Sequence, residues 1–451
     1  MRHERLPPSP GCPSAANSRE SLAPFDLLML LDERPGYPMC FFMETAFSGP
    51  LNVSKLRTAI ATAARRHPRL RSRAEQGPNG WHWVPTETDP PLIVLPSALS
   101  ADNGRCQAAF RAFHLRREPG IRAVLFEEST NDYSLVLQLH HSVCDGLAAL
   151  EFLGDVWSIY HGSEPPRLRP GLIREDRSTP TLPSAPSAAP NDQASATWTF
   201  ASYLPSRLAC SNHKTPITSN CRPYQTIRLS RQETRAVQAA ATAIGTAVND
   251  LTIAAGMRAL CRWNSRQGKP AKLVRINMPV SLRPVGCRQP ATNQIGYAFL
   301  DRTPKACESA VGLAQSLAAA SRWIRATGAA GIFLDVLKRL VRWPWLLRLL
   351  TRLPLSLSTA VISNVGNVQP RMKARVPTRD GRDCPGELVI TAVAGVPPVR
   401  PGTALAVGVT CYAGELAITA LTDPAEFSDQ ENNQLGEMLV AELLAFSQGR
   451  A

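Results

Sequence analysis

The spacing of apolar side chains predicts alternating strands and helices in the first half of the chain. Between Leu51 and His67, apolar residues recur every three to four positions, as in a helix that buries one face. Pro68 follows directly and ends this helix, because proline cannot continue it. Short strands are expected on either side, over residues 40–46 and 81–84.

The second half shows the same mixture of patterns. Two S-x-x-E sequences, Ser230–Glu233 and Ser428–Glu431, are capping boxes that predict helices ending near residues 245 and 446. Asn249-Asp250 suits the N-cap of a helix better than a reactive pair. The other expected elements are helices over 251–263 and 307–327 and strands over 272–280, 360–363, 388–393, 404–412 and 416–421. Strands and helices in both halves predict the α/β or α+β class.

A proline-rich stretch divides the predicted elements into two groups. The chain has 451 residues, which is too long for one ordinary compact core. The stretch after residue 162 is rich in Pro, Ser and Ala, a composition typical of a connection without regular structure. We therefore expect a flexible tail over 1–21, an N-terminal lobe over 22–162, a crossover linker over 163–225 and a C-terminal lobe over 226–451.

The candidate chemistry lies where a predicted strand meets a predicted helix. Along the strand, every second residue is a leucine, at Leu135, Leu137 and Leu139. Because side chains alternate along a strand, His141 falls on the face of these leucines and His140 points the other way. Gly146 precedes a helical pattern over 147–160. His141 is thus expected at a strand–turn–helix junction.

An imidazole in this position suits general base catalysis. Neutral histidine is the usual group for taking a proton from a hydroxyl or amine at pH 7. Asp145 is placed to stabilise the turn. Gly146 has no side chain, so that a substrate could approach the backbone there. On the pattern alone, a structural role for His141 stays open. A metal site built from His141 and Asp145 lacks a third ligand at suitable spacing.

The segment His140-His141-Ser-Val-Cys-Asp145-Gly146 resembles the HHxxxDG signature of the coenzyme-A-dependent acyltransferase superfamily. That superfamily includes chloramphenicol acetyltransferase, condensation domains of nonribosomal peptide synthetases, polyketide-associated acyltransferases and bacterial wax ester synthase/diacylglycerol acyltransferases. Further likenesses follow in the expected order over roughly residues 22–446: the first helix and strand at 51–73, the "ND" helix from 248, "PVxxR" at 279–283, "NxxG" at 293–296, the "SN" strand at 362–366 and the closing strand pair at 411–416. The "ND" helix is shared by the wax ester synthase branch and stand-alone condensation-like proteins.

The resemblance implies a two-lobed fold like that of chloramphenicol acetyltransferase. It has mixed sheets with helices and a tunnel between the lobes, which acyl donor and acceptor enter from opposite faces. In such a fold His141 removes the acceptor's proton as the acceptor attacks a thioester directly, without a covalent acyl-enzyme. His140 would support the site through packing.

The resemblance also assigns supporting roles around His141. Asp145 would be structural, and Arg283 in the PVxxR-like strand is its expected partner, because a buried carboxylate needs one. Ser363 and Asn364 are expected to position substrate or to donate to the tetrahedral oxyanion, with the Gly146 backbone as a further donor.

The expected function is therefore acyl transfer from acyl-CoA or an acyl-carrier protein to a small-molecule alcohol or amine. We expect an ester in preference to an amide, with no permanently bound cofactor and no metal. The alternative is a catalytically silent, condensation-like binding or docking protein. Cys144 lies within the motif as a rival nucleophile, although a small packing role is the simpler expectation for it.

The net charge of +14 favours an anionic partner. Coenzyme A, an acidic carrier protein or an anionic membrane face would fit, as would a basic surface without a specific partner. Nucleic acid is not expected, because the chain has no RNP box or C2H2 finger and its Lys and Arg are scattered. The eleven cysteines lack metal or disulfide spacing and no signal peptide is recognisable, which favours the cytoplasm.

Residues 332–353 carry an amphipathic pattern. Basic residues lie on one face of two predicted helices and apolar residues on the other, and Trp343 and Trp345 lie at their junction. Such helices lie in membrane interfaces, so peripheral contact with the inner membrane face is one expectation. The other is that the apolar stripe packs on the sheet of the second lobe and the arginines are solvated.

Overall fold

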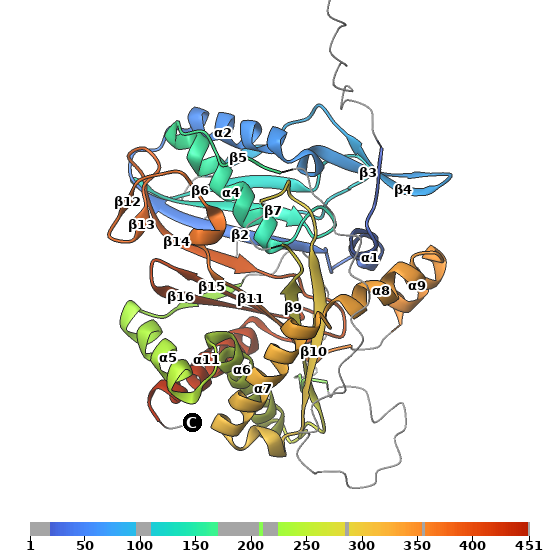
Figure 1. Cartoon of the computed structure of the whole chain (residues 1–451), viewed down its shortest axis with the longest axis vertical. Helices are drawn as coiled ribbons and strands as arrows, with labels where there is room; N and C mark the ends of the chain where they lie inside the picture. Colours follow the sequence, from blue (N-terminus) through green and yellow to red (C-terminus); the bar gives the residue numbers. More distant parts are fainter. Residues whose placement is uncertain are drawn as a thin grey trace, which may run out of the picture.

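The computed structural model describes residues 19–95, 110–169, 207–210, 224–284, 288–353 and 357–449. Two sheets face each other at the centre, and helices cover the outer face of each (Figure 1). Each sheet with its helices has its own apolar core. The expected α/β class, with mixed sheets and two lobes, is confirmed.

The N-terminal lobe is built on a five-stranded sheet. Its order is β14 (Val389–Val396), β2 (Cys40–Ser48), β7 (Asp132–His140), β6 (Ile121–Ser129) and β5 (Leu92–Leu95). Neighbours are antiparallel except β5 and β6, which are parallel. The helices α2 (Val53–Arg66) and α4 (Gly146–His161) pack their apolar faces on it. A small sheet of β1 (Glu20–Ser21), β4 (Gly80–Pro85) and β3 (Ser72–Gly77) lies beside this lobe.

The C-terminal lobe is built on a six-stranded sheet. Its order is β10 (Ile295–Arg302), β9 (Val274–Ser281), β11 (Ala360–Asn367), β15 (Leu405–Tyr412), β16 (Glu415–Thr422) and β8 (Gln225–Arg228). Four helices cover its outer face: α5 (Arg231–Ile244), α6 (Val248–Arg266), α7 (Ala310–Thr327) and α11 (Asp429–Ser447). The two capping boxes start α5 and α11 as expected, since both serine side chains accept from the N3 amides.

One strand departs from the expected division into lobes at 22–162 and 226–451. Strand β14 lies within the range expected for the C-terminal lobe, but it pairs with β2 and completes the N-terminal sheet. It also packs on β15, where a Cβ at Gly408 would lie 2.0 Å from the Gly395 carbonyl oxygen. The chain therefore crosses back between the lobes. The N-terminal boundary shifts slightly, because β1 begins at Glu20 within the expected tail. Most of the predicted linker lies outside the described residues.

Two short helices and the first helix form a separate cluster beside the sheets. These are α8 (Gly331–Leu340), α9 (Pro344–Arg352) and α1 (Pro24–Asp32), and the last was not foreseen as a helix. Leu337 of α8 and Leu347 of α9 are buried against α1. A Cβ at Gly296 of β10 would lie 2.1 Å from the carbonyl oxygen of Ala330, so glycine allows the chain before α8 to pack closely on the sheet.

The start of α6 also differs from the expectation. The helix begins at Val248, so Asn249 and Asp250 lie within its first turn rather than at its N-cap. Asp250 still caps the helix, because its carboxylate accepts from the Ala247 amide at 3.1 Å. The short remaining elements are α10 (Gln369–Met372), the hairpin β12 (Thr378–Arg379) with β13 (Arg382–Asp383), and the 3-10 turns Pro68–Arg71 and Lys305–Cys307.

Candidate active site

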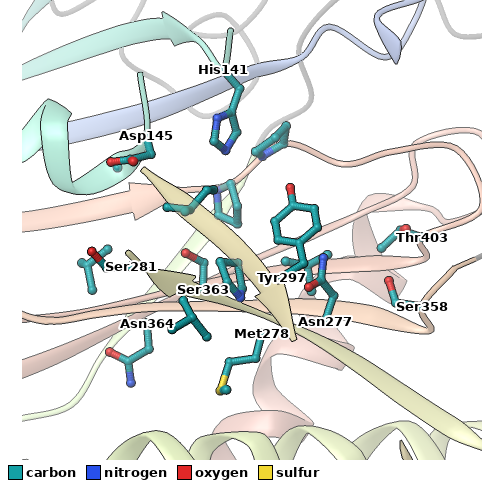
Figure 2. A pocket seen from close by; sticks show the side chains of 18 of the residues that line it. His141, Asp145, Asn277, Met278, Ser281, Tyr297, Ser358, Ser363, Asn364 and Thr403 are labelled. Carbon is teal, nitrogen blue, oxygen red and sulfur yellow. The ribbon is translucent and has the colours of Figure 1, made fainter. Parts of the chain in front are cut away.

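A cavity of about 910 Å³ lies between the two lobes. Strands β9, β10 and β11 of the C-terminal sheet form its floor, and the lining residues there include Asn277, Ser281, Tyr297 and Ser363. Residues of the N-terminal lobe, including His141 and Asp145, enter from the other side (Figure 2). Such a cavity is large enough for a substrate with a long side chain or acyl chain.

His141 reaches the cavity from the turn that follows β7. Its backbone amide donates to the Met39 carbonyl oxygen at 2.7 Å, which extends the pairing of β2 and β7 by one residue. The imidazole lies against two rings, Phe25 and Phe41, with centroid separations of 5.6 and 5.2 Å. His141 is half-buried and lines the cavity, as a base that must meet a substrate requires.

The surroundings favour the neutral imidazole. Burial lowers the pKa of His141 below its usual 6.5, and its own backbone carbonyl and the charge of Asp145 oppose this only in part. A group that is unprotonated at neutral pH is ready to accept a proton.

Asn293, which precedes β10, holds the turn that carries His141. Its side-chain amide nitrogen donates to the His141 carbonyl at 2.7 Å, to the Ser142 carbonyl at 3.1 Å and to the Asp26 carboxylate at 2.8 Å. Asp26 is fully buried and also accepts from Arg69 at 2.9 Å. The sequence placed Asn293 in an NxxG match without a role. Sequence patterns do not single out Asp26, because no local signal marks one buried carboxylate of an apolar helix as part of a site.

Asp145 and Arg283 lie together, as the resemblance implied. The Arg283 guanidinium donates to the Asp145 carboxylate at 2.7 Å. Asp145 also caps α4 by accepting from the Ala148 amide at 3.0 Å, and it accepts from the Gln294 amide at 2.8 Å. Its oxygens are therefore occupied by partners that hold the turn.

His140 does not line the cavity. It is fully buried, its Nε2 lies 3.1 Å from Glu33 Oε2, and its Nδ1 accepts from the Ser142 amide at 3.1 Å. The two neighbouring histidines therefore differ in surroundings, since only His141 faces the space where a substrate would lie.

Ser363, Asn364 and Gly146, which are expected to contact the oxyanion or the substrate, also line the cavity. Ser363 and Asn364 are neighbours on β11, and Figure 2 shows the Ser363 side chain on the side of the strand that faces His141 and the Asn364 side chain on the opposite side. The Asn364 side-chain oxygen accepts from the Gly366 amide at 2.8 Å, so this side chain supports the local turn of β11 and the expected role at the oxyanion falls to Ser363. A Cβ at Gly146 would meet only Val365, at 3.8 Å. Tight packing therefore does not require glycine here, and its effect is to leave space in the cavity.

Cys144 is fully buried in the apolar core of the N-terminal lobe. Burial raises the pKa of its thiol well above the usual value, and the charge of Asp145 raises it further. A thiol that stays protonated is a poor nucleophile. Over the part of the chain that the structure describes, no group of three or more His, Cys, Asp or Glu side chains could hold a metal ion.

Residues 29–170 match the family model of the condensation domain. Over 116 residues the chain is 34% identical to a probable non-canonical nonribosomal peptide synthetase, CymA, of Salinispora arenicola; the match covers 25% of this chain and 2% of that protein. The curated relatives are much longer, and the matched stretches span 1–6% of their length.

Solved structures extend the likeness to most of the chain at the level of the fold. The first condensation domain of the calcium-dependent antibiotic synthetase, in complex with a substrate analogue, has a TM-score of 0.68 at 16% identity and covers 96% of this chain and 98% of that one. The starter condensation domain of rhizomide synthetase, an R148A mutant in complex with C8-CoA, has a TM-score of 0.61 at 14% identity, with 96% and 95% covered. The expected resemblance to condensation domains is thereby confirmed: residues 29–170 match the family model, and the described residues have the fold of condensation domains.

Proposed function

We propose that this protein transfers an acyl group from a thioester to a hydroxyl or amine, with His141 as the general base. The observation that carries the proposal is the position of His141: a half-buried imidazole with a lowered pKa, on the cavity between the lobes. Condensation-domain homology supports acyl transfer as the class of reaction.

The proposed step needs no covalent acyl-enzyme. His141 takes the proton from the acceptor's oxygen or nitrogen as that atom attacks the thioester carbonyl carbon. The tetrahedral oxyanion accepts hydrogen bonds from the Ser363 hydroxyl or the Gly146 backbone amide. When the carbon–sulfur bond breaks, the leaving thiolate takes the proton from the His141 imidazolium, which restores the neutral base.

The donor is proposed to be acyl-CoA or an acyl group on a phosphopantetheinyl carrier protein. The rhizomide synthetase domain in complex with C8-CoA is a neighbour of the same fold, which supports coenzyme A as the first donor to try. The basic net charge of +14 suits either anionic donor. No resident cofactor enters the proposed step.

The acceptor decides between an ester and an amide, and we propose the ester first. The test is to incubate the protein with acyl-CoA donors of several chain lengths and with matched pairs of alcohol and amine acceptors that share one carbon skeleton. Mass spectrometry of the products identifies both partners. Amide products alone would contradict the ester assignment. Consumption of no donor, from either coenzyme A or carrier protein, would favour the silent binding protein.

A further inference from the structure

Helices α8 and α9 carry more apolar surface than their packing uses. Their inner faces are already occupied, since Leu337 and Leu347 are buried against α1. Outward, Trp345 is 67% exposed, Leu349 53% and Trp343 51%. Figure 1 shows the two helices projecting beside α1, away from both helix layers. Packing of an apolar stripe against the rest of the protein therefore explains the inner face of these helices. The outer apolar face is not covered by it.

Exposed basic side chains lie on the same segment as this apolar face. Between residues 331 and 353 there are five basic residues, all exposed: Lys338, Arg339, Arg342, Arg348 and Arg352. The one acidic residue, Asp335, lies 3.2 Å from Lys338 and is neutralised by it. Arg348 and Leu349 are adjacent on α9, so charge and apolar surface are interleaved. Tryptophan and leucine flanked by arginine suit the boundary between lipid headgroups and acyl chains.

The same helices form a wall of the cavity that contains His141. Phe333, Leu337 and Leu340 of α8 and Leu347 and Leu350 of α9 line it. Leu350, Leu353 and Leu357 both line the cavity and are exposed, so one opening of the cavity lies beside the end of α9. An apolar opening next to an exposed apolar and basic surface would let a chain pass from a bilayer into the cavity.

We propose that α8 and α9 dock the protein on an anionic bilayer, and that the opening beside α9 admits the apolar chain of a lipid substrate from that surface. The docking stands on the exposed surface alone, whereas the admission of substrate rests on the proposed acyl transfer. Interleaved tryptophan and leucine favour a bilayer over an acidic carrier protein, which the basic residues alone would also attract. None of the described helices is long and apolar enough to cross a membrane, so the contact is peripheral.

Vesicle flotation tests the docking without any turnover. The wild-type protein should float with vesicles of phosphatidylcholine and phosphatidylglycerol at low salt, and weakly with phosphatidylcholine alone. The variant Arg339→Glu/Arg342→Glu/Arg348→Glu should bind the anionic vesicles on the order of 100-fold less well or weaker, since each basic residue near such a surface contributes to binding. Trp345→Ser/Leu349→Ser should weaken binding to both vesicles.

Matched controls separate the effect of the α8–α9 surface from effects of net charge and of misfolding. Arg228→Glu/Arg235→Glu/Arg322→Glu makes the same charge change at exposed arginines of β8, α5 and α7 and should float far better than the α8–α9 variant. Thermal unfolding of all variants checks that they are folded. Wild-type protein that stays unbound at low salt, or equal loss in both triple variants, would overturn the docking.

The His141→Ala variant keeps the two parts of the proposal distinguishable. It should float like wild type although it does not turn over, so failure of the proposed chemistry would leave the docking result intact. The α8–α9 variants should retain transfer between soluble short-chain substrates and lose transfer to a vesicle-embedded acceptor. If the α8–α9 variants lost transfer only from a carrier-bound donor and still floated like wild type, the surface would bind an acidic carrier protein. That result would overturn the proposal.

Discussion

The guanidinium of Arg283 lies 2.7 Å from the carboxylate of Asp145 and joins the two lobes at the cavity wall. Arg283 follows β9 of the C-terminal sheet, and Asp145 caps the helix that follows the His141 turn. Both side chains are largely buried. The pair therefore connects the turn that carries the proposed base to the C-terminal lobe.

Breaking this pair should destabilise the protein as well as slow transfer. Arg283→Met leaves a buried carboxylate without its partner, which costs about 3–5 kcal/mol in the free energy of unfolding. Urea unfolding measures this cost. The matched control is the more exposed pair of Arg111 and Glu118, where Arg111→Met should cost less than about 1 kcal/mol, since Glu118 also lies 3.7 Å from Arg122. Asp145→Asn with full stability but no activity would instead make Asp145 a chemical participant.

Much of the site was predictable because its signals are local. The HHxxxDG turn, the capping boxes and the strand alternation each act over a few residues, and the structure has the corresponding elements. The placement of β14 was not predictable, because an apolar strand fits either sheet and only tertiary packing selects β2 as its partner. The Asn293 contacts join residues more than 100 positions apart, and single-sequence patterns carry no such information.

The pH dependence should follow the neutral form of His141. Its pKa is lowered by burial, so the neutral base is lost only as the pH falls below its usual 6.5. The acidic limb of kcat/KM should therefore lie below pH 6.5, with little change from there to neutral pH. An acidic limb centred above pH 7 would contradict the proposed environment of the imidazole.

Folding must be followed at the same pH values, because His67 has a lowered pKa as well, chiefly from burial. Below the usual pKa of histidine, the unfolded chain binds more protons than the folded one. Stability therefore falls as the pH drops from 6.5 through the lowered values. Thermal unfolding at each pH separates this loss from titration of the base: the melting temperature should still exceed the assay temperature where activity is halved.

Transfer should be direct, without an acyl group on the protein. Cys144 is the rival nucleophile, but its buried thiol has a raised pKa and should stay protonated. Incubation with acyl-CoA alone should give no stable mass increase of the intact protein, and Cys144→Ser should retain turnover if it folds. A mass increase that disappears in Cys144→Ser together with turnover would establish a covalent intermediate.

The most direct test of the central claim is the turnover of His141→Ala with a donor and acceptor that the wild type uses. Losing the general base should lower the rate about 100- to 10,000-fold in a protein that remains folded. His140→Ala is the matched control: it removes the contact with Glu33 and should act mainly on stability. Near-normal turnover by folded His141→Ala, or a folded His140→Ala variant just as inactive, would contradict the account.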